Sequence, residues 1–150
     1  MSSRVSLLID IIYKNPGIHF CEMIRVSGIK NGTLAHYIEK LELDGHIQIQ
    51  REKKKTRFFS PKISQEEIKI INYLRKETSK NIILSLIKHN SLKFSEIVKK
   101  SKKSPSTTSQ NLSELIHSEI LVMKIDDSQK KYFLKNQNLI LKLVKKYKFQ

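Results

Sequence analysis

The sequence predicts a mostly helical α+β fold, built from two tandem copies of a unit in which three helices are followed by a small β-hairpin. Apolar residues recur at helical spacing over most of the chain, and short segments alternate between apolar and polar residues. The chain also aligns with itself, without a gap, after a shift of 74 residues. With 39% apolar residues over 150 positions, the composition suffices for a buried core.

The internal alignment pairs residues along the whole unit. Identical pairs include Ile9 with Ile83, Phe20 with Phe94, Ser27 with Ser101, Thr33 with Thr107, Leu41 with Leu115 and Tyr73 with Tyr147. A generic helical period shared by two stretches would explain agreement in the helices. It would not explain why the strand-like segments agree as well. We therefore expect two copies of one fold, residues 1–74 and 75–150.

The first unit is expected to contain helices and a hairpin in a fixed order. The helices are predicted at 3–14, 20–27 and 31–44, and the hairpin strands at 46–51 and 57–59, around a turn at 52–55. Asn15-Pro16-Gly17, Gly28 and Gly45 are the expected stops of the three helices. Ser64 and Glu67 have the spacing of a capping box that opens a linker helix over about 64–76.

The second unit is expected to repeat this order. Its helices are predicted at about 79–89, from an N-cap at Ser95, and from Ser104-Pro105 as N-cap and first helical residue. Its strands are predicted at 120–123 and 131–134, its turn at 126–129 and a last helix at 138–148. Residues 64–90 contain neither Gly nor Pro, so one long helix is an alternative. We expect a break near Thr78-Ser79, because these residues favour caps over helix interiors.

The charge is strongly positive and uneven. The net charge is +15, with +4 in residues 1–74 and +11 in residues 75–150. Such a charge is typical of proteins that bind nucleic acid or anionic membranes. No apolar run has the length that spans a bilayer, and Asp10 interrupts the apolar N-terminal stretch, which argues against a signal peptide. Cys21 is the only cysteine, which excludes an internal disulfide. We expect a cytoplasmic, nucleoid-associated protein.

Two segments resemble a known family. SPSTTSQNLSELIHSEIL (104–121) resembles the helix-turn-helix of MarR- and ArsR-like bacterial and archaeal regulators. NGTLAHYIEKLELDGHIQ (31–48), with RFFSP (57–61), resembles archaeal winged-helix regulators of the same broad group. Three helices followed by a two-stranded hairpin is the winged-helix order, so the resemblance implies two tandem winged-helix units. Tandem units on a short chain are similar to archaeal transcriptional regulators, and the implied function is transcription regulation by binding double-stranded DNA.

The resemblance implies that the third helix of each unit lies in the major groove. By helical phase, Leu34, Ile38 and Leu41 face the core in one unit, and Thr108, Leu112 and Leu115 face it in the other. The candidate base-reading residues on the exposed faces are Thr33, His36, Lys40, Ser106, Thr107, Ser109, Gln110 and Ser113. Family members often carry Arg on this face, where this chain has His36 and Gln110. The alternative is that these are ordinary solvated helix residues.

Basic residues near the hairpins and turns are the candidate phosphate contacts. They are Lys30, Arg51, Lys53, Lys54, Lys55, Arg57, Lys102, Lys103, Lys130 and Lys131. A charge run at a hairpin tip often serves solubility alone. Asp126 and Asp127 make the second hairpin the weaker candidate.

Enzyme readings find no motif in the sequence. There is no Gly-rich phosphate loop, no paired-histidine metal spacing and no nucleophile motif, so we expect no enzymatic activity, no metal and no cofactor. The expected partner is double-stranded DNA, bound by a monomer with two repeated units or by a weak homodimer. Two alternatives stay open: a winged-helix protein-interaction module that contacts the transcription machinery, and a chromatin-like protein that coats DNA without choosing a sequence.

Overall fold

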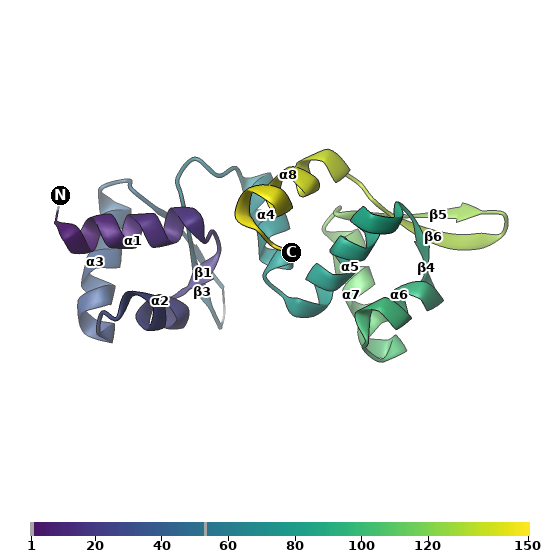
Figure 1. Cartoon of the computed structure of the whole chain (residues 1–150), viewed down its shortest axis with the longest axis horizontal. Coiled ribbons are helices and arrows are strands. Elements are labelled where there is room, and N and C mark those ends of the chain that lie inside the picture. The colour runs from purple at the N-terminus through teal and green to yellow at the C-terminus, as the bar shows by residue number, and fades with distance from the viewer. Residues whose placement is uncertain (1, 53) are drawn as a thin grey trace. The chain divides into compact units, whose positions relative to one another are not determined.

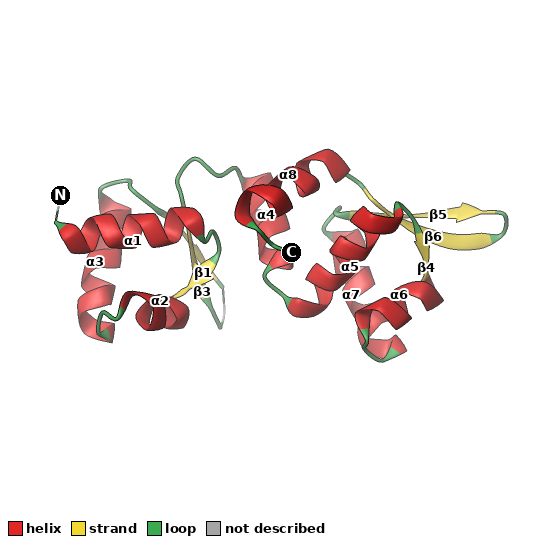
Figure 2. Ribbon diagram, in the orientation of Figure 1, coloured by secondary structure: helices red, strands yellow, loops and turns green. Residues whose placement is uncertain are grey.

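The computed structural model describes residues 2–52 and 54–150, which fold into two compact units, Met1–Ile68 and Lys69–Gln150. Each unit combines short helices with a small antiparallel sheet (Figure 1; Figure 2). The fold class is therefore mixed α and β, as expected from the sequence. Among the described residues there are eight helices and two three-stranded sheets.

The first unit carries its helices before its hairpin. Its elements are α1 (Ser3–Lys14), β1 (Ile18–His19), α2 (Phe20–Ser27), α3 (Asn31–Leu43), β2 (Gln48–Arg51) and β3 (Thr56–Phe59). Strand β3 is central, with β1 and β2 antiparallel on either side. Helix α4 (Gln65–Leu74) follows and crosses into the second unit.

Local signals set the ends of these helices. The Ser2 hydroxyl accepts a hydrogen bond from the Val5 amide at 3.2 Å and caps α1. Gly28 adopts a left-handed φ of 71° and ends α2, since glycine takes that conformation without a steric cost. Ser64 and Glu67 exchange side-chain-to-amide bonds at 3.0 and 3.1 Å, which confirms the capping box before α4.

The core of the first unit lies between α1, α2, α3 and the sheet. Its buried members include Leu8, Ile12, Met23, Leu34, Ile38, Leu41 and Phe58. The inward face predicted for α3 is confirmed, because Leu34, Ile38 and Leu41 are all buried. This packing fixes which side of α3 remains exposed.

The second unit has the same order of elements. They are α5 (Glu77–His89), β4 (Leu92–Lys93), α6 (Phe94–Ser101), α7 (Pro105–His117), β5 (Leu121–Asp126), β6 (Gln129–Leu134) and α8 (Gln137–Tyr147). Strand β6 is central, between β4 and β5. Ser104 caps α7 by accepting from the Thr107 amide at 3.1 Å, with Pro105 at the first helical position, as the sequence predicts.

Corresponding elements of the two units lie 74 residues apart. Helix α2 runs over 20–27 and α6 over 94–101, while α3 runs over 31–43 and α7 over 105–117. The sheet register has the same offset: Ile18 pairs with Phe58 and Leu92 with Tyr132, and Gln48 pairs with Phe59 and Val122 with Phe133.

The structure corrects two predicted caps. Ser95 is not the N-cap of α6. Lys93 holds that position, and the Glu96 carboxylate accepts from the Lys93 amide at 2.9 Å. The break after α4 falls at Arg75-Lys76 rather than at Thr78-Ser79. Ser79 supports this break from inside α5, because its hydroxyl donates to the Tyr73 carbonyl at 2.6 Å.

The compact units divide at residue 68, whereas the sequence predicts a boundary at residue 74. The reason lies in α4. The Tyr73 hydroxyl and the Ser118 hydroxyl are 2.8 Å apart, so the end of α4 is hydrogen-bonded to the second unit. The segment before α4 belongs to the first unit, because the Gln48 amide donates to the carbonyls of Ser60 and Ile63, each at 2.8 Å.

The hairpin of the second unit is longer than that of the first. Its strands have six residues each, against four in β2 and β3. Asp127 and Ser128 form its two-residue turn, both with positive φ, at 50° and 64°. Such a turn matches the right-handed twist of the strands. Figure 1 shows β5 and β6 extending beyond the helices of this unit.

Candidate nucleic-acid interface

Helix α7 presents a mostly polar outer face, on which Glu114 is an exposed carboxylate. Thr108, Leu112 and Leu115 are buried on its inner side, as predicted. The candidate base-reading side chains of this helix all lie exposed: Ser106, Thr107, Ser109, Gln110 and Ser113. Positions 106, 110, 113 and 117 follow one another at helical spacing, so Gln110 lies near the middle of the exposed face.

Hydrogen bonds hold α6 and α7 together at their turn. The Ser101 and Thr108 hydroxyls are 3.0 Å apart, and both side chains are buried. Ser101 also donates to the Val98 carbonyl at 3.1 Å and accepts from the Lys103 amide at 3.3 Å. Lys102 completes the turn with a left-handed φ of 58°. Because buried hydroxyls need partners, these bonds favour one angle between the two helices.

The Thr107 hydroxyl lies at the N-terminus of α7. It accepts a hydrogen bond from the Ser104 hydroxyl at 3.0 Å, which leaves the Thr107 proton free to donate outward. Ser104 in turn accepts from the Thr107 amide. The cap therefore orients Thr107 and still leaves it a hydrogen-bonding group for a ligand.

Helix α3 exposes a different set of side chains. Thr33, His36 and Lys40 are exposed as predicted. Glu39 is exposed on the same side of the helix, and Leu43 is 80% exposed near its end. The Glu39 carboxylate opposes approach to a phosphate backbone, whereas the exposed Lys40 beside it favours such an approach.

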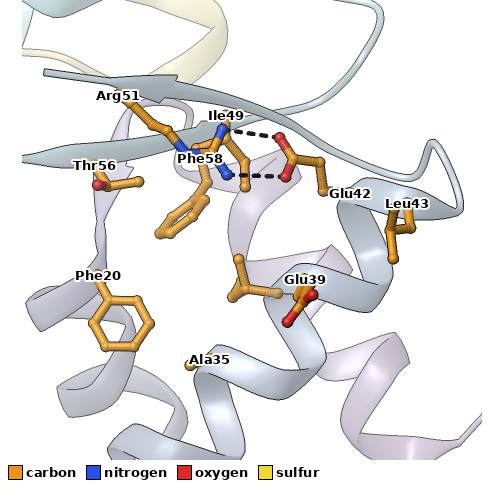
Figure 3. A pocket seen from close by; sticks show the side chains of 10 residues that line it. Phe20, Ala35, Glu39, Glu42, Leu43, Ile49, Arg51, Thr56 and Phe58 are labelled. Carbon is orange, nitrogen blue, oxygen red and sulfur yellow. Dashed lines mark hydrogen bonds and ion pairs between the residues drawn. The ribbon is translucent and has the colours of Figure 1, made fainter.

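A groove lies between α3 and the hairpin in the first unit. It has a volume of about 450 Å³, and Phe20, Ile49 and Phe58 supply its apolar wall (Figure 3). Glu39 and Leu43 line it from α3. The second unit has a groove of about 360 Å³ at the corresponding place. Each lining residue of the second groove lies 74 positions after one of the first: Phe94, Ser109, Leu112, Ser113, Ile116, His117 and Tyr132.

Arg51 and Glu42 form an ion pair at the end of the first groove. The guanidinium donates to the two carboxylate oxygens at 2.9 and 3.1 Å, as the dashed lines in Figure 3 show. The hydrogen bond from Arg51 lowers the pKa of Glu42, and the same bond raises the pKa of Arg51. Arg51 remains 63% exposed, so its paired guanidinium can reach phosphate only by exchanging partners.

The structure corrects the prediction for Arg57. Its side chain is 3% exposed and donates from Nη1 to the Gly17 carbonyl at 2.7 Å. Burial lowers the pKa of Arg57, opposed by the charges of Glu52 and Glu22. A buried guanidinium that is hydrogen-bonded to the loop between α1 and β1 is not accessible to phosphate, so Arg57 is not a phosphate contact.

The other predicted phosphate contacts differ in accessibility. Lys131 is half-buried and pairs with Asp126 at 3.0 Å. Lys53 lies outside the described residues. The exposed members of the set are Lys30, Lys54, Lys55, Lys102, Lys103 and Lys130. Lys102 and Lys103 lie in the turn just before α7, and Lys30 is the N-cap of α3, so each of these helices has lysine near its N-terminus.

Sequence reasoning missed the features that distinguish the first unit. It gave no role to Glu39, Glu42 or Leu43. It also missed that Ile125 in β5 is 71% exposed. The spacing of Glu39 and Leu43 could have placed both side chains on the outer face of α3. The Glu42–Arg51 pair had no such signal, because it joins residues nine positions apart on different elements.

The described residues contain no cluster of three or more His, Cys, Asp and Glu side chains suited to a metal ion. No helix in that part of the chain is both long and apolar enough to cross a bilayer.

Comparison with known families places a match on the first unit. Residues 3–71 match the family HTH_HVO_0163_N, described as an N-terminal HTH (helix-turn-helix) domain. These residues are similar to a helix-turn-helix domain. The match extends from α1 into α4 and covers the groove of the first unit. The resemblance to helix-turn-helix proteins is confirmed at this level.

Two solved structures are similar to part of this chain. The transcriptional repressor PagR of Bacillus anthracis is 19% identical, with 53% of this chain and 90% of PagR covered and a TM-score of 0.47. HlyU from Vibrio cholerae N16961 is 21% identical, with 57% of this chain and 96% of HlyU covered and a TM-score of 0.49. Comparison with curated proteins gives no match.

Proposed function

We propose that this chain is a transcriptional regulator that binds double-stranded DNA, with α7 in the major groove. The observation that carries the proposal is the outer face of α7, which exposes Ser106, Thr107, Ser109, Gln110 and Ser113, carries one carboxylate, Glu114, and is preceded by Lys102 and Lys103. A helix held by its inner face, with hydrogen-bonding groups outward and cations at its N-terminus, suits a groove between phosphate backbones. The helix-turn-helix match over residues 3–71 supports the same class of function.

Base reading is proposed for Gln110 and Thr107 first. Glutamine can pair with adenine through both ends of its amide, and threonine can donate to or accept from several bases. Ser106, Ser109 and Ser113 surround them as further candidates. Thr33, His36 and Lys40 are proposed to make the weaker contribution from α3, because Glu39 shares their face.

Phosphate contact is proposed for the exposed lysines. Lys102, Lys103 and Lys130 would contact the phosphates on either side of α7, and Lys30, Lys54 and Lys55 those beside α3. A lysine ammonium meets phosphate as a point charge and carries no sequence information. Lys131 and Arg51 would join only after leaving their carboxylate partners.

The two units are proposed to be copies of one winged-helix fold, of the MarR- and ArsR-like archaeal type. The common offset of 74 residues in helix bounds, strand register and groove lining supports this. A monomer in the nucleoid would then present two reading helices, where a single-unit regulator needs a dimer.

The test is a gel-shift titration on random duplex DNA over a series of salt concentrations. Neutralising six to ten phosphates predicts a loss of affinity of about a thousandfold or more between low and physiological salt. A flat response to salt would refute the DNA-binding function.

The groove of the first unit favours a second candidate function, a protein-interaction module. Its lining of aromatic side chains with Glu39 and Leu43 suits a protein partner better than a phosphate backbone. A third candidate is a DNA coat without base choice, favoured by the lack of arginine on the exposed faces of α3 and α7. Equal affinity for a selected duplex and its scrambled version would establish the coat.

A further inference from the structure

The two most exposed large apolar side chains of the described residues lie one in each unit. They are Leu43, 80% exposed on α3, and Ile125, 71% exposed on β5. Leu43 lines the groove of the first unit. Ile125 lies next to the turn of the long hairpin, in register with Lys130. Exposed apolar side chains that line a groove or lie at the tip of a hairpin are typical of interaction surfaces.

The groove of the first unit combines apolar walls with an available carboxylate. Arg51 neutralises Glu42 at one end. Glu39, beside the apolar wall, has no ion-pair partner within the described part of the chain (Figure 3). In a chain of net charge +15, a site with this lining attracts a segment that offers an apolar side chain next to a lysine.

The hairpin of the second unit offers that combination. Met123 and Ile125 alternate along β5 with Lys124, and Lys130 lies opposite Ile125 on β6. Alternation places Met123, Ile125 and Lys130 on one face of the hairpin. The two-residue turn at Asp127-Ser128 gives the hairpin a fixed, narrow tip.

We propose that the tip of this hairpin docks into the first-unit groove of a second copy of the chain. Ile125 enters the apolar wall formed by Phe20, Ile49 and Phe58, and Lys130 pairs with Glu39. The contact joins two different surfaces, so one copy keeps its groove free and the other keeps its hairpin free. Association of this kind is open-ended and builds rows rather than closed dimers.

The contact is small, since one hairpin tip fills one groove. Interfaces well below the usual size are weak and transient in solution. The proposal itself is independent of DNA binding and is tested without DNA.

The experiment is analytical ultracentrifugation of the full chain from micromolar to submillimolar concentration, in low salt and at about 0.5 M salt. We expect mass to rise with concentration past the dimer, and less so in high salt. Ile125→Glu and Leu43→Glu should each weaken association by about tenfold or more. A 1:1 mixture of these two variants should form dimers only, because one retains a working groove and the other a working hairpin.

Leu7→Glu is the matched control, since Leu7 is 43% exposed on α1 and lies outside the groove. It should leave association unchanged. Circular dichroism checks that the variants are folded, and the charge swap of Glu39→Lys with Lys130→Glu in the same chain should restore association lost by Glu39→Lys. A monomer at every concentration, an equal effect of Leu7→Glu, or an inert mixture would overturn the proposal.

Discussion

Helices α3 and α7 occupy the same place in their units and expose different chemistry. Both have 13 residues, and both follow an eight-residue helix after a short turn. Both also line a groove together with the central strand of their sheet, β3 or β6. Where α3 has Glu39 and Leu43, α7 has Ser113 and His117, and where α3 has Lys40, α7 has Glu114. One scaffold therefore carries different exposed side chains in its two units.

The difference extends into the turn before each helix. In the first unit, Gly28 makes the left-handed turn and Leu34 packs in the core. In the second unit, Lys102 makes the turn, and the buried Thr108 hydroxyl is hydrogen-bonded to Ser101. At this position the first unit is stabilised by apolar packing, whereas the second unit has a buried hydrogen bond between two hydroxyls.

The largest expected difference is electrostatic. Changing Lys102, Lys103 and Lys130 to Ala should weaken binding to random duplex on the order of a hundredfold at low salt and lower the salt slope by up to about three. Changing Lys30, Lys54 and Lys55 to Ala should have a smaller effect, because Glu39 already opposes phosphate there. Fluorescence anisotropy over a salt series measures both. Equal losses in the two triple variants would mean that the units contribute equally.

The next largest effect concerns how each unit is held together. Leu34→Ala should lower the free energy of unfolding by about 2–5 kcal/mol, because it removes a fully buried side chain. Thr108→Val should cost about 1–3 kcal/mol, because Ser101 loses a buried partner. Urea titration followed by circular dichroism measures both values. A neutral Thr108→Val variant would show that apolar packing alone holds the second unit.

The two helices should also differ in how much they contribute to the choice of base sequence. Gln110→Ala should cost about 1–3 kcal/mol on a selected site and little on a scrambled one. His36→Ala, the change at the corresponding position of α3, should cost less on both. Paired titrations of each variant on the two duplexes give the comparison. If Gln110→Ala loses the same affinity for the selected and the scrambled duplex, α7 does not read bases.

The smallest expected effect is that of the Glu42–Arg51 pair. The pKa of Glu42 is lowered in the folded chain, so the pair stabilises the fold at pH values above the ordinary glutamate pKa. That stability is lost as the pH falls through the lowered value. Glu42→Gln should therefore be slightly less stable than the parent at neutral pH and equal to it in acid. Thermal melts across this pH range check the result, and a difference that persists in acid would assign the effect to packing.

Local structure was largely predictable from the sequence, because its signals are local. Ser104-Pro105 before α7, the capping box at Ser64 and Glu67, and glycine at position 28 each act within a few residues. The inward faces of α3 and α7 follow from helical periodicity. The wrong cap at Ser95 shows the limit, since Lys93 and Glu96 offered a competing start two residues earlier.

The candidate site was predictable in its exposed residues and not in their partners. Helical phase places Gln110 and Thr107 outward, and the structure agrees. Whether Arg57, Arg51 and Lys131 can reach phosphate depends on their partners in other segments, which are the Gly17 carbonyl, Glu42 and Asp126. No periodicity encodes which of several nearby carboxylates or carbonyls a long side chain will meet.

The left-handed backbone at Lys102 has a consequence for protein engineering. A non-glycine residue in this conformation carries a steric cost of about 1–2 kcal/mol, and its counterpart Gly28 avoids that cost. Selection for heat resistance would favour glycine at position 102. Selection for tight binding to a polyanion would favour the lysine. This position is therefore a place where directed evolution toward thermostability and toward activity would pull a single residue in opposite directions.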